Sequence, residues 1–287
     1  CALIGQTKDL APSDKKLYAL RDVTATVECI PLICGSILAK KLAEGIDALV
    51  LDVKFGRGAF MKTEAQAQEL ASALVKVGRA GGKQVRALIT AMDQPLGRTV
   101  GNALEVEESI ACLRGAGPED LMEVTYALGA QMLILGGVAK DATEAEAKLR
   151  AVIADGSALE KFREIVIAQG ADGRVIDEPK RLPQAALKIV LPATATGIIA
   201  EVDAMKVALA ALRLGAGRTK AEDKIDPGVG VSGLVKIGEP IKAGAPLCVI
   251  HANDEAAAKA AAAMLAEAFR VVEVKPATTP LITDLLC

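Results

Sequence analysis

Residues 18–60, YALRDVTATVECIPLICGSILAKKLAEGIDALVLDVKFGRGAF, decide the fold that we expect for this chain. Pro31 suits the first turn of a helix, because it lacks the N–H that would be unpaired there. Gly45 suits the end of the same helix. The apolar run at 48–53 is typical of a buried parallel strand, and a glycine-rich loop at 54–60 follows it. This alternation of helix and strand predicts an α/β fold.

Three polar residues stand in this largely apolar stretch. Ser36 and Lys40 are four residues apart, so they share one face of the expected helix, and that face lies among apolar side chains. Arg21 belongs to the preceding helix, for which Ser13 is a suitable N-cap. A lysine with apolar neighbours either extends to water or meets a partner. The pattern alone favours a solvated lysine and a surface serine.

The remaining elements follow from capping and burial patterns. Thr63 and Gln66 form a capping box that opens a helix, and Gly81–Gly82 ends it. A second buried strand is expected at 85–90, and helices are then expected at 102–114, 118–135, 143–154 and 157–169. Charge and proline gather at 172–183, which indicates a boundary. Beyond this boundary, strands are expected at 186–191, 197–202, 233–237 and 246–251, and helices at 204–214 and 255–269.

Composition excludes several classes of protein. The chain has 287 residues, a net charge of −2, no Trp and only two Tyr, so it is neither a general binder of phosphate backbones nor a stacking platform for nucleic acid. No apolar run approaches the roughly 20 residues of a membrane span, and no signal-peptide pattern is present. None of the six cysteines forms a CxxC pair, which favours free thiols in a reducing cytoplasm. A first residue of Cys1 and not Met suggests processing or truncation.

The quoted stretch resembles thymidine phosphorylase and pyrimidine-nucleoside phosphorylase. The similarity continues through QPLGRTVGNALEVEES at 94–109, LGAGR at 214–218 and VIHANDE at 249–255. The resemblance implies that Arg21, Ser36 and Lys40 bind the pyrimidine base. It also implies that apolar and aromatic side chains surround the base, namely Tyr18, Val27, Ile33, Ile37 and Phe60. The glycine-rich phosphate loop and the Lys-His-Ser cluster of that family precede this stretch and do not appear here, so the chain resembles the C-terminal part of such an enzyme.

The pattern of elements predicts α/β with a mostly parallel sheet flanked by helices, followed by a smaller α+β subdomain. The resemblance adds that part of a small helical lobe precedes the sheet. The expected domains are a strand stub (2–5) and linker within 1–12, part of the helical base-binding lobe at 13–45, an α/β domain at 46–178, and the C-terminal α+β subdomain at 184–287.

The implied activity is that of a pentosyltransferase, which converts thymidine or uridine and phosphate into the free base and (deoxy)ribose 1-phosphate. The implied setting is nucleoside salvage by a cytoplasmic homodimer, with phosphate as co-substrate and no organic cofactor. This chain would supply the base-binding half of the site and would be inactive alone.

Further candidate residues have competing interpretations. Lys54, with Arg57, could approach phosphate or ribose, although a lysine at a strand end is commonly solvated. Leu96, Thr99 and Glu108 fall where related enzymes bind a potassium ion through two backbone carbonyls and one carboxylate. In this chain that site would be incomplete, because the remaining ligands are upstream. A position on the helix surface is an equal alternative for Glu108.

Other interpretations compete with the nucleoside hypothesis. Arg21 could form an ion pair with Asp22 or Glu28 instead of binding a base. His251 is better explained as a structural histidine at a strand end than as a general base. Lys206 lies in AMKV, a motif similar to that of biotinyl and lipoyl carriers, but the residues after it are typical of a helix and not of a return strand. Phosphoribosyltransferases of the anthranilate type share the general architecture.

Overall fold

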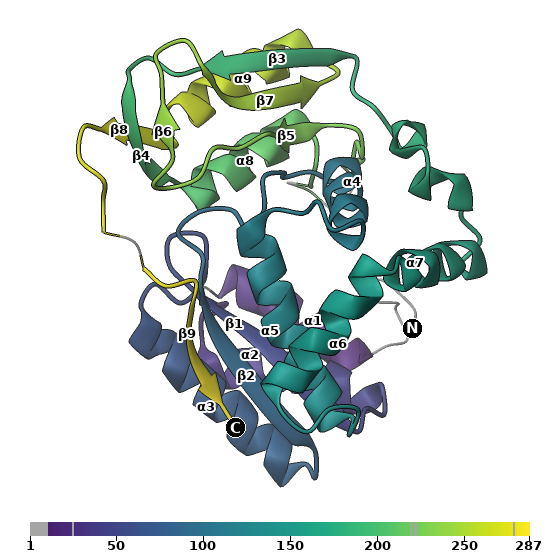
Figure 1. The fold of residues 1–287 in the computed structure, drawn as a ribbon. Coiled ribbons are helices and arrows are strands. Elements are labelled where there is room, and N and C mark those ends of the chain that lie inside the picture. The colour runs from purple at the N-terminus through teal and green to yellow at the C-terminus, as the bar shows by residue number, and fades with distance from the viewer. Residues whose placement is uncertain (1–10, 25, 219, 221–222, 278) are drawn as a thin grey trace. The chain divides into compact units, whose positions relative to one another are not determined.

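The computed structural model describes residues 11–287 apart from 25, 219, 221–222 and 278 (Figure 1). The strand stub expected at 2–5 lies outside the described residues. The chain divides into two compact units. Unit 1 contains residues up to 91 together with 124–150 and 280–287, and unit 2 contains 92–123 and 151–279. Both units are discontinuous in sequence, whereas the domains expected from the sequence are consecutive blocks, whose boundaries stay a prediction.

Two helices open unit 1. Helix α1 spans Pro12–Val23 and helix α2 spans Ile30–Ala43. Ser13 is not the N-cap of α1, because Pro12 already occupies the first turn and Ala11 holds the N-cap position with a left-handed φ of 48°. Helix α2 follows the prediction, with Pro31 in its first turn and Gly45 just beyond its end at a φ of 72°.

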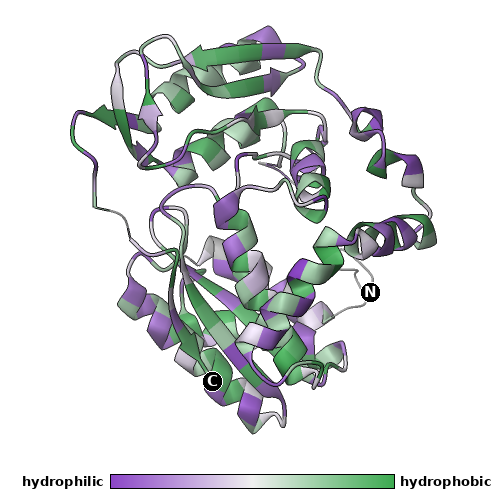
Figure 2. Ribbon diagram, viewed as in Figure 1, coloured by the Kyte–Doolittle hydropathy of each residue, from purple (hydrophilic) through white to green (hydrophobic). Residues whose placement is uncertain are grey.

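A three-stranded sheet forms the centre of unit 1, in the order β1-β2-β9. Strands β1 (Ala48–Phe55) and β2 (Gln84–Ala91) are parallel over their whole length, and β9 (Ile282–Leu286) pairs with β2 in the antiparallel sense. The sequence did not indicate β9. Helix α3 (Glu64–Ala80) begins with the predicted capping box and packs on β1 and β2. The strands are predominantly hydrophobic (Figure 2), and their inward side chains share one core with α2 and α3.

The other helices agree closely with the prediction. Helix α5 spans Glu119–Leu135 and helix α6 spans Ala142–Ala154, and a small alanine-rich core lies where their unit 1 portions pack. In unit 2, α4 spans Asn102–Leu113 and α7 spans Ser157–Ala168. Two short 3-10 turns follow, at Gly173–Ile176 and Pro179–Arg181.

The C-terminal part of unit 2 has an α+β arrangement of two three-stranded sheets, ordered β3-β7-β5 and β6-β4-β8, in which the paired strands are antiparallel. Helices α8 and α9 pack against each other, and their apolar faces share one core with both sheets. The bounds are β3 Leu187–Pro192, β4 Gly197–Val202, α8 Ala204–Leu214, β5 Gly230–Ser232, β6 Pro240–Ile241, β7 Pro246–Ala252, α9 Glu255–Ala266 and β8 Phe269–Val272. Together the units confirm the predicted α/β class with a C-terminal α+β subdomain.

A close backbone approach ties the loop before α4 to β5. Val100 and Val231 exchange two backbone hydrogen bonds of 2.8 Å. Gly230 permits this approach, because a Cβ at that position would lie 2.2 Å from the carbonyl oxygen of Val100. The strand expected at 233–237 is wrong, since Gly233 adopts a left-handed φ of 62° immediately after β5. In the described part of the chain, no helix is both long and apolar enough to span a bilayer.

Candidate functional site

Helices α1 and α2 bring together a group that we call the α1–α2 cluster: Asp14, Arg21, Ser36 and Lys40. Lys40 Nζ donates hydrogen bonds to Ser36 Oγ at 2.9 Å and to Asp14 Oδ2 at 2.7 Å. Asp14 and Ser36 are both 8% exposed. Lys40 is therefore not a purely solvated lysine, and the spacing of four residues on α2 does place Ser36 and Lys40 together.

Asp14 is a member of the cluster that the sequence did not suggest. Burial by itself raises the pKa of the Asp14 carboxyl group, but hydrogen bonds from Lys40 and Ser36 and the charges of Lys40 and Arg21 outweigh it, so the pKa falls below its ordinary value. The charge of Arg21 thus acts on the same carboxylate that pairs with Lys40. The only sequence signal for Asp14 was its position in the first turn of α1, where exposed carboxylates are also common.

Arg21 is 5% exposed and is held by backbone carbonyls. Its guanidinium group donates to the carbonyl oxygen of Val27 and, at 3.4 Å, to those of Thr26 and Leu32. The guanidinium carbon also lies 5.1 Å from the centre of the Tyr18 ring, which is a cation–π geometry. The segment between α1 and α2 therefore fixes the orientation of Arg21. The side chain of Asp22, one of its alternative partners, lies outside the described part of the chain.

The predicted apolar neighbours of the base lie in different surroundings. Tyr18 and Phe60 are 42% and 58% exposed, respectively. Ile33 and Ile37 are half-buried and pack against the core of unit 1. Val27 contributes its carbonyl to Arg21. The structure thus joins Tyr18 and Val27 to Arg21, and it joins Ile33 and Ile37 to the apolar core beneath α2.

Lys54 belongs to a second polar network in unit 1. Its Nζ donates to Asp52 Oδ2 at 2.7 Å and to Thr90 Oγ1 at 3.0 Å, and the Thr90 hydroxyl donates to Asp52. Lys54 and Thr90 are register partners near the carboxyl ends of β1 and β2. That edge of a parallel sheet is where open α/β folds bind ligands.

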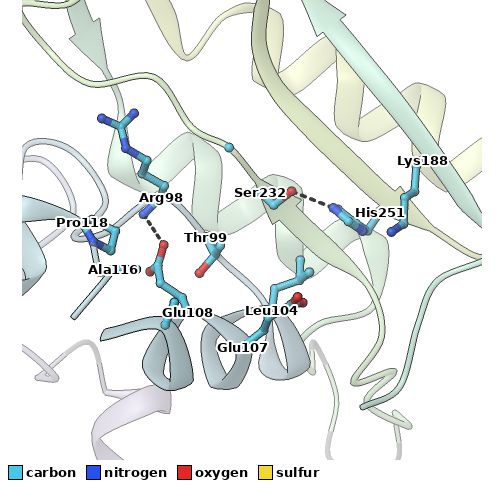
Figure 3. A pocket seen from close by; sticks show the side chains of 13 residues that line it. Arg98, Thr99, Leu104, Glu107, Glu108, Ala116, Pro118, Lys188, Ser232 and His251 are labelled. Carbon is cyan, nitrogen blue, oxygen red and sulfur yellow. Dashed lines mark hydrogen bonds between the residues drawn. The ribbon is translucent and has the colours of Figure 1, made fainter. Parts of the chain in front are cut away.

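A pocket of about 630 Å³ lies within unit 2 (Figure 3). It contains two of the three predicted potassium ligands, Thr99 and Glu108, and Leu96 lies in the same loop. Its lining residues are Arg98, Thr99, Leu104, Glu107, Glu108, Ala111, Ala116, Gly117, Pro118, Lys188, Ser232, Gly233 and His251.

Glu108 is half-buried and faces the loop at 94–99. Its Oε1 accepts the backbone N–H of Arg98 at 2.8 Å. Burial raises the pKa of Glu108, although this hydrogen bond opposes the shift. Gly97 suits this position because its φ of 72° is left-handed, and a Cβ there would also lie 2.2 Å from Glu108 Oε2, so a larger residue would displace the carboxylate. Glu108 is therefore held against the loop and is not simply solvated on the surface of α4.

The single histidine of the sequence has a buried, paired position. His251 on β7 is 6% exposed, and its Nε2 shares a hydrogen bond of 2.7 Å with Ser232 Oγ on β5 (Figure 3). Burial lowers the pKa of His251, and the charge of Lys188 lowers it further. A neutral imidazole that links two strands agrees with the structural interpretation of this residue.

Lys206 does not lie on a hairpin tip. It is in the first turn of α8, which Asp203 caps, and its Nζ donates to the carbonyl oxygen of Glu267 at 2.9 Å. A carrier lysine is presented at a tight turn between strands, so the helix removes the basis of the carrier alternative. Within the described residues, no group of three or more His, Cys, Asp and Glu side chains is placed to hold a metal ion.

Comparisons with known proteins agree with this architecture. Residues 1–159 match the family model described as "Glycosyl transferase family, a/b domain", and residues 198–272 match "Pyrimidine nucleoside phosphorylase C-terminal domain". The chain is 52% identical over 254 residues to a pyrimidine-nucleoside phosphorylase of Bacillus subtilis, which covers 88% of this chain and 59% of that protein. It is 49% identical over 254 residues to the enzyme of the same name from Staphylococcus haemolyticus, again over 88% and 59%.

A third relative, the pyrimidine-nucleoside phosphorylase of Staphylococcus aureus, is 49% identical over 252 residues, which is 88% of this chain and 58% of the relative. The chain therefore spans about three fifths of the length of the curated relatives that it matches.

Proposed function

This chain belongs to the glycosyl transferase family whose a/b domain its first 159 residues match, and its relatives in the comparisons are pyrimidine-nucleoside phosphorylases. We therefore propose that it acts in the phosphorolysis of pyrimidine nucleosides. In this reaction the bond between N1 of the base and C1′ of the sugar breaks, and its electron pair stays with the base. An oxygen of phosphate forms the new bond to C1′. The products from thymidine or uridine are the free base and (deoxy)ribose 1-phosphate.

The α1–α2 cluster is the proposed base-binding half of the site. The observation that carries this assignment is the contact of Lys40 with Ser36, beside an ionised Asp14 on which the charge of Arg21 also acts. Negative charge develops on the carbonyl oxygens of the departing base, and fixed cations stabilise charge that appears only in the transition state. Arg21 offers a planar fork, Lys40 a compact charge, and Ser36 a hydroxyl that can donate or accept.

Asp14 fixes the position of the Lys40 ammonium group before a ligand binds. The carboxylate holds the ammonium beside Ser36, so the lysine is oriented before a base arrives. We assign Tyr18, Phe60, Val27, Ile33 and Ile37 to the surroundings of the base. Tyr18 is the best supported of these, since it already stacks with Arg21.

Lys54 is the proposed contact to phosphate or ribose. It lies near the carboxyl ends of the parallel strands, and Asp52 and Thr90 fix its ammonium group. An ammonium group held in this way presents a positive charge without a large cost in side-chain entropy.

A monovalent cation is the proposed inorganic component. The carbonyl oxygens of Leu96 and Thr99 and the carboxylate of Glu108 would hold it, and hard oxygen donors suit potassium. The support is the half-buried Glu108, which the Arg98 N–H fixes against this loop. Bound there, the ion would supply positive charge that stabilises the loop. Exchange of potassium for lithium at constant ionic strength should lower the rate of the enzyme that contains this chain, and an unchanged rate would contradict the proposal.

We further propose that the enzyme is a cytoplasmic homodimer. The support is a set of exposed apolar side chains on α1 and α2, which a second copy of the chain would cover. Leu17, Leu20 and Leu32 are 56%, 57% and 38% exposed, respectively. Sedimentation equilibrium of the protein tests this point, with a mass of two chains expected and a monomer mass contradicting it.

The proposed activity is tested by phosphate-dependent release of base from thymidine and uridine, measured on the enzyme that contains this chain. Lys40→Met should lower kcat/KM by roughly 10–100-fold, because a hydrogen bond to a charged group contributes about 1.5–3 kcal/mol. Lys41→Met is the matched control, since the neighbouring Lys41 pairs with Glu44 on the exposed surface. Equal activity of the two variants would contradict the assignment.

A further inference from the structure

Unit 2 contains a buried lysine that the proposed reaction does not use. Lys236 lies between β5 and β6 and is 9% exposed. Its Nζ donates to the carbonyl oxygens of Pro95 at 2.5 Å and Gly97 at 2.7 Å, and it pairs with Asp120 Oδ2 at 2.6 Å. These oxygens come from the loop at 94–99 and from the first turn of α5, and we call the arrangement the Lys236 cage.

The backbone on both sides of this cage is also paired. The amide oxygen of Gln94 accepts the N–H of Ile237 at 2.9 Å. Arg98 donates to the carbonyl oxygen of Leu234 at 2.9 Å, and its own carbonyl accepts the N–H of Leu234 at 3.0 Å. Glu239 pairs with the Arg98 guanidinium and accepts the N–H of Lys236 at 2.9 Å. The segment at 234–239 therefore bonds to the loop along its length, in place of the strand expected there.

The donors and acceptors of the cage match one another. An ammonium group has three N–H donors and no acceptor, and Lys236 has three oxygen partners. A buried charge is costly unless it is paired and hydrogen-bonded. Asp120 supplies the opposite charge and also accepts the N–H of Gly97 at 3.3 Å. Two carbonyl oxygens and one carboxylate oxygen therefore surround a single positive charge, that of the ammonium group.

We propose that the Lys236 ammonium is the resident cation of this oxygen-lined cage, and that it holds the loop at 94–99 in the conformation that places the Arg98 N–H and Thr99 beside Glu108. The role of Lys236 as a positioning residue for the cation-binding residues rests on the proposed function. The cage itself rests only on the contacts of Lys236.

A lysine that acts as a tethered cation can be replaced by a free one. Lys236→Ala removes the side chain and leaves a space lined by the oxygens of Pro95, Gly97 and Asp120. Ammonium and methylammonium ions carry the missing charge and N–H donors, whereas tetramethylammonium carries the charge without donors and is larger. Ammonium and methylammonium should therefore restore the stability that Lys236→Ala loses, and tetramethylammonium should not.

The test measures the midpoint of thermal unfolding of wild-type protein and Lys236→Ala in each of the three chlorides at equal ionic strength. The expected result is a lower midpoint for Lys236→Ala that ammonium or methylammonium restores by at least half, with no restoration by tetramethylammonium. Lys242→Ala, an exposed lysine of the same unit, is the matched control and should keep the wild-type midpoint. A wild-type midpoint for Lys236→Ala, or equal effects of all three ions, would overturn the proposal.

A second variant keeps the test decisive if Lys236→Ala does not fold. Asp120→Asn keeps the shape of the side chain and removes the charge opposite Lys236. Amide hydrogen exchange of Arg98, whose N–H bonds to Glu108 and not to Asp120, should then be about tenfold faster than in the wild type, because opening of the loop costs less. Unchanged exchange at the Arg98 amide would overturn the proposal.

Base affinity, measured separately at the α1–α2 cluster, distinguishes the two proposals. Rescue of Lys236→Ala in a protein that binds no pyrimidine base would support the cage and contradict the proposed function. Base binding without selective rescue would leave the proposed function standing and overturn the cage.

Discussion

The α1–α2 cluster and the Lys236 cage are both built on a lysine and an aspartate, yet they leave the ammonium group in different states. Among the described residues, Lys40 has two acceptors, Asp14 and Ser36, whereas Lys236 has three. The Lys40 side chain is 25% exposed and that of Lys236 is 11% exposed. Since an ammonium group has three donors, Lys40 keeps one for a ligand and Lys236 keeps none. The comparison separates a lysine placed to bind from a lysine placed to hold a loop.

The largest expected effect breaks the loop that the cage holds. Gly97→Ala would combine a left-handed φ with a Cβ placed 2.2 Å from Glu108 Oε2. We expect the free energy of unfolding to fall by about 1–3 kcal/mol from backbone strain alone, and further from the displaced carboxylate. Urea denaturation measures it.

Gly82→Ala is the matched control for Gly97→Ala. Gly82 has a similar φ of 76°, but nothing lies within 4 Å of its Cβ position. The difference between the two variants reports the contact with Glu108, and equal destabilisation would contradict that contact.

A smaller effect concerns the carboxylate of the α1–α2 cluster. The pKa of Asp14 is lowered in the folded state, so its contribution is complete above the unfolded value of 3.8 and is lost as the pH falls through the folded value. Asp14→Asn should lower the free energy of unfolding at pH 7 by about 1 kcal/mol and reduce its decline below pH 3.8. Denaturation at several pH values measures this, and a decline as steep as that of the wild type would contradict the role of Asp14.

The histidine of unit 2 gives a pH dependence in a different range. The folded pKa of His251 lies below the unfolded value of 6.5, so the unfolded state binds more protons between these two values. Stability should therefore rise with pH through this window and be lost as the solution is acidified. His251→Gln should flatten the curve of unfolding midpoint against pH near 6, and an unchanged curve would assign the dependence to other groups.

The last prediction leaves both clusters intact and concerns the reactivity of exposed and buried cysteine thiols. Cys29 and Cys287 are exposed, whereas Cys34 and Cys248 are buried. Burial raises the pKa of the Cys248 thiol to about 12, so it has very little reactive thiolate at pH 8. Mass spectrometry after brief alkylation should find label on Cys29 and Cys287 and not on Cys248. Rapid labelling of Cys248 in the folded protein would contradict its buried position.

The elements that were predicted correctly are those whose signals are local. The capping box of Thr63 and Gln66 opens α3, and the bounds expected for α8 are those observed. Strand β9 was missed because its pairing with β2 joins residues nearly 200 positions apart, which no local pattern records. The prediction of a strand at 233–237 rested on an apolar pattern and was wrong. Gly233 turns the chain there, and Lys236 bonds to the loop at 94–99 and not to a neighbouring strand.

The candidate site divides in the same way. The spacing of Ser36 and Lys40 placed both residues on one face of a helix, and the structure shows them in contact. The pattern also favoured a surface serine, which is wrong, because Ser36 is buried where α2 packs. Asp14, the partner of Lys40, comes from another helix, and Asp120, the partner of Lys236, is 116 positions away in sequence. Tertiary packing selects such partners, and their residue types are too common for a sequence to single them out.

The most direct test of the central claim is a calorimetric titration of the protein with uracil and with thymine, repeated on Lys40→Met and Lys41→Met. If Lys40 binds the base, the wild type and Lys41→Met should bind with equal affinity, and Lys40→Met should bind roughly 10–100-fold more weakly. Equal affinity of all three proteins would contradict the claim that the α1–α2 cluster binds a pyrimidine.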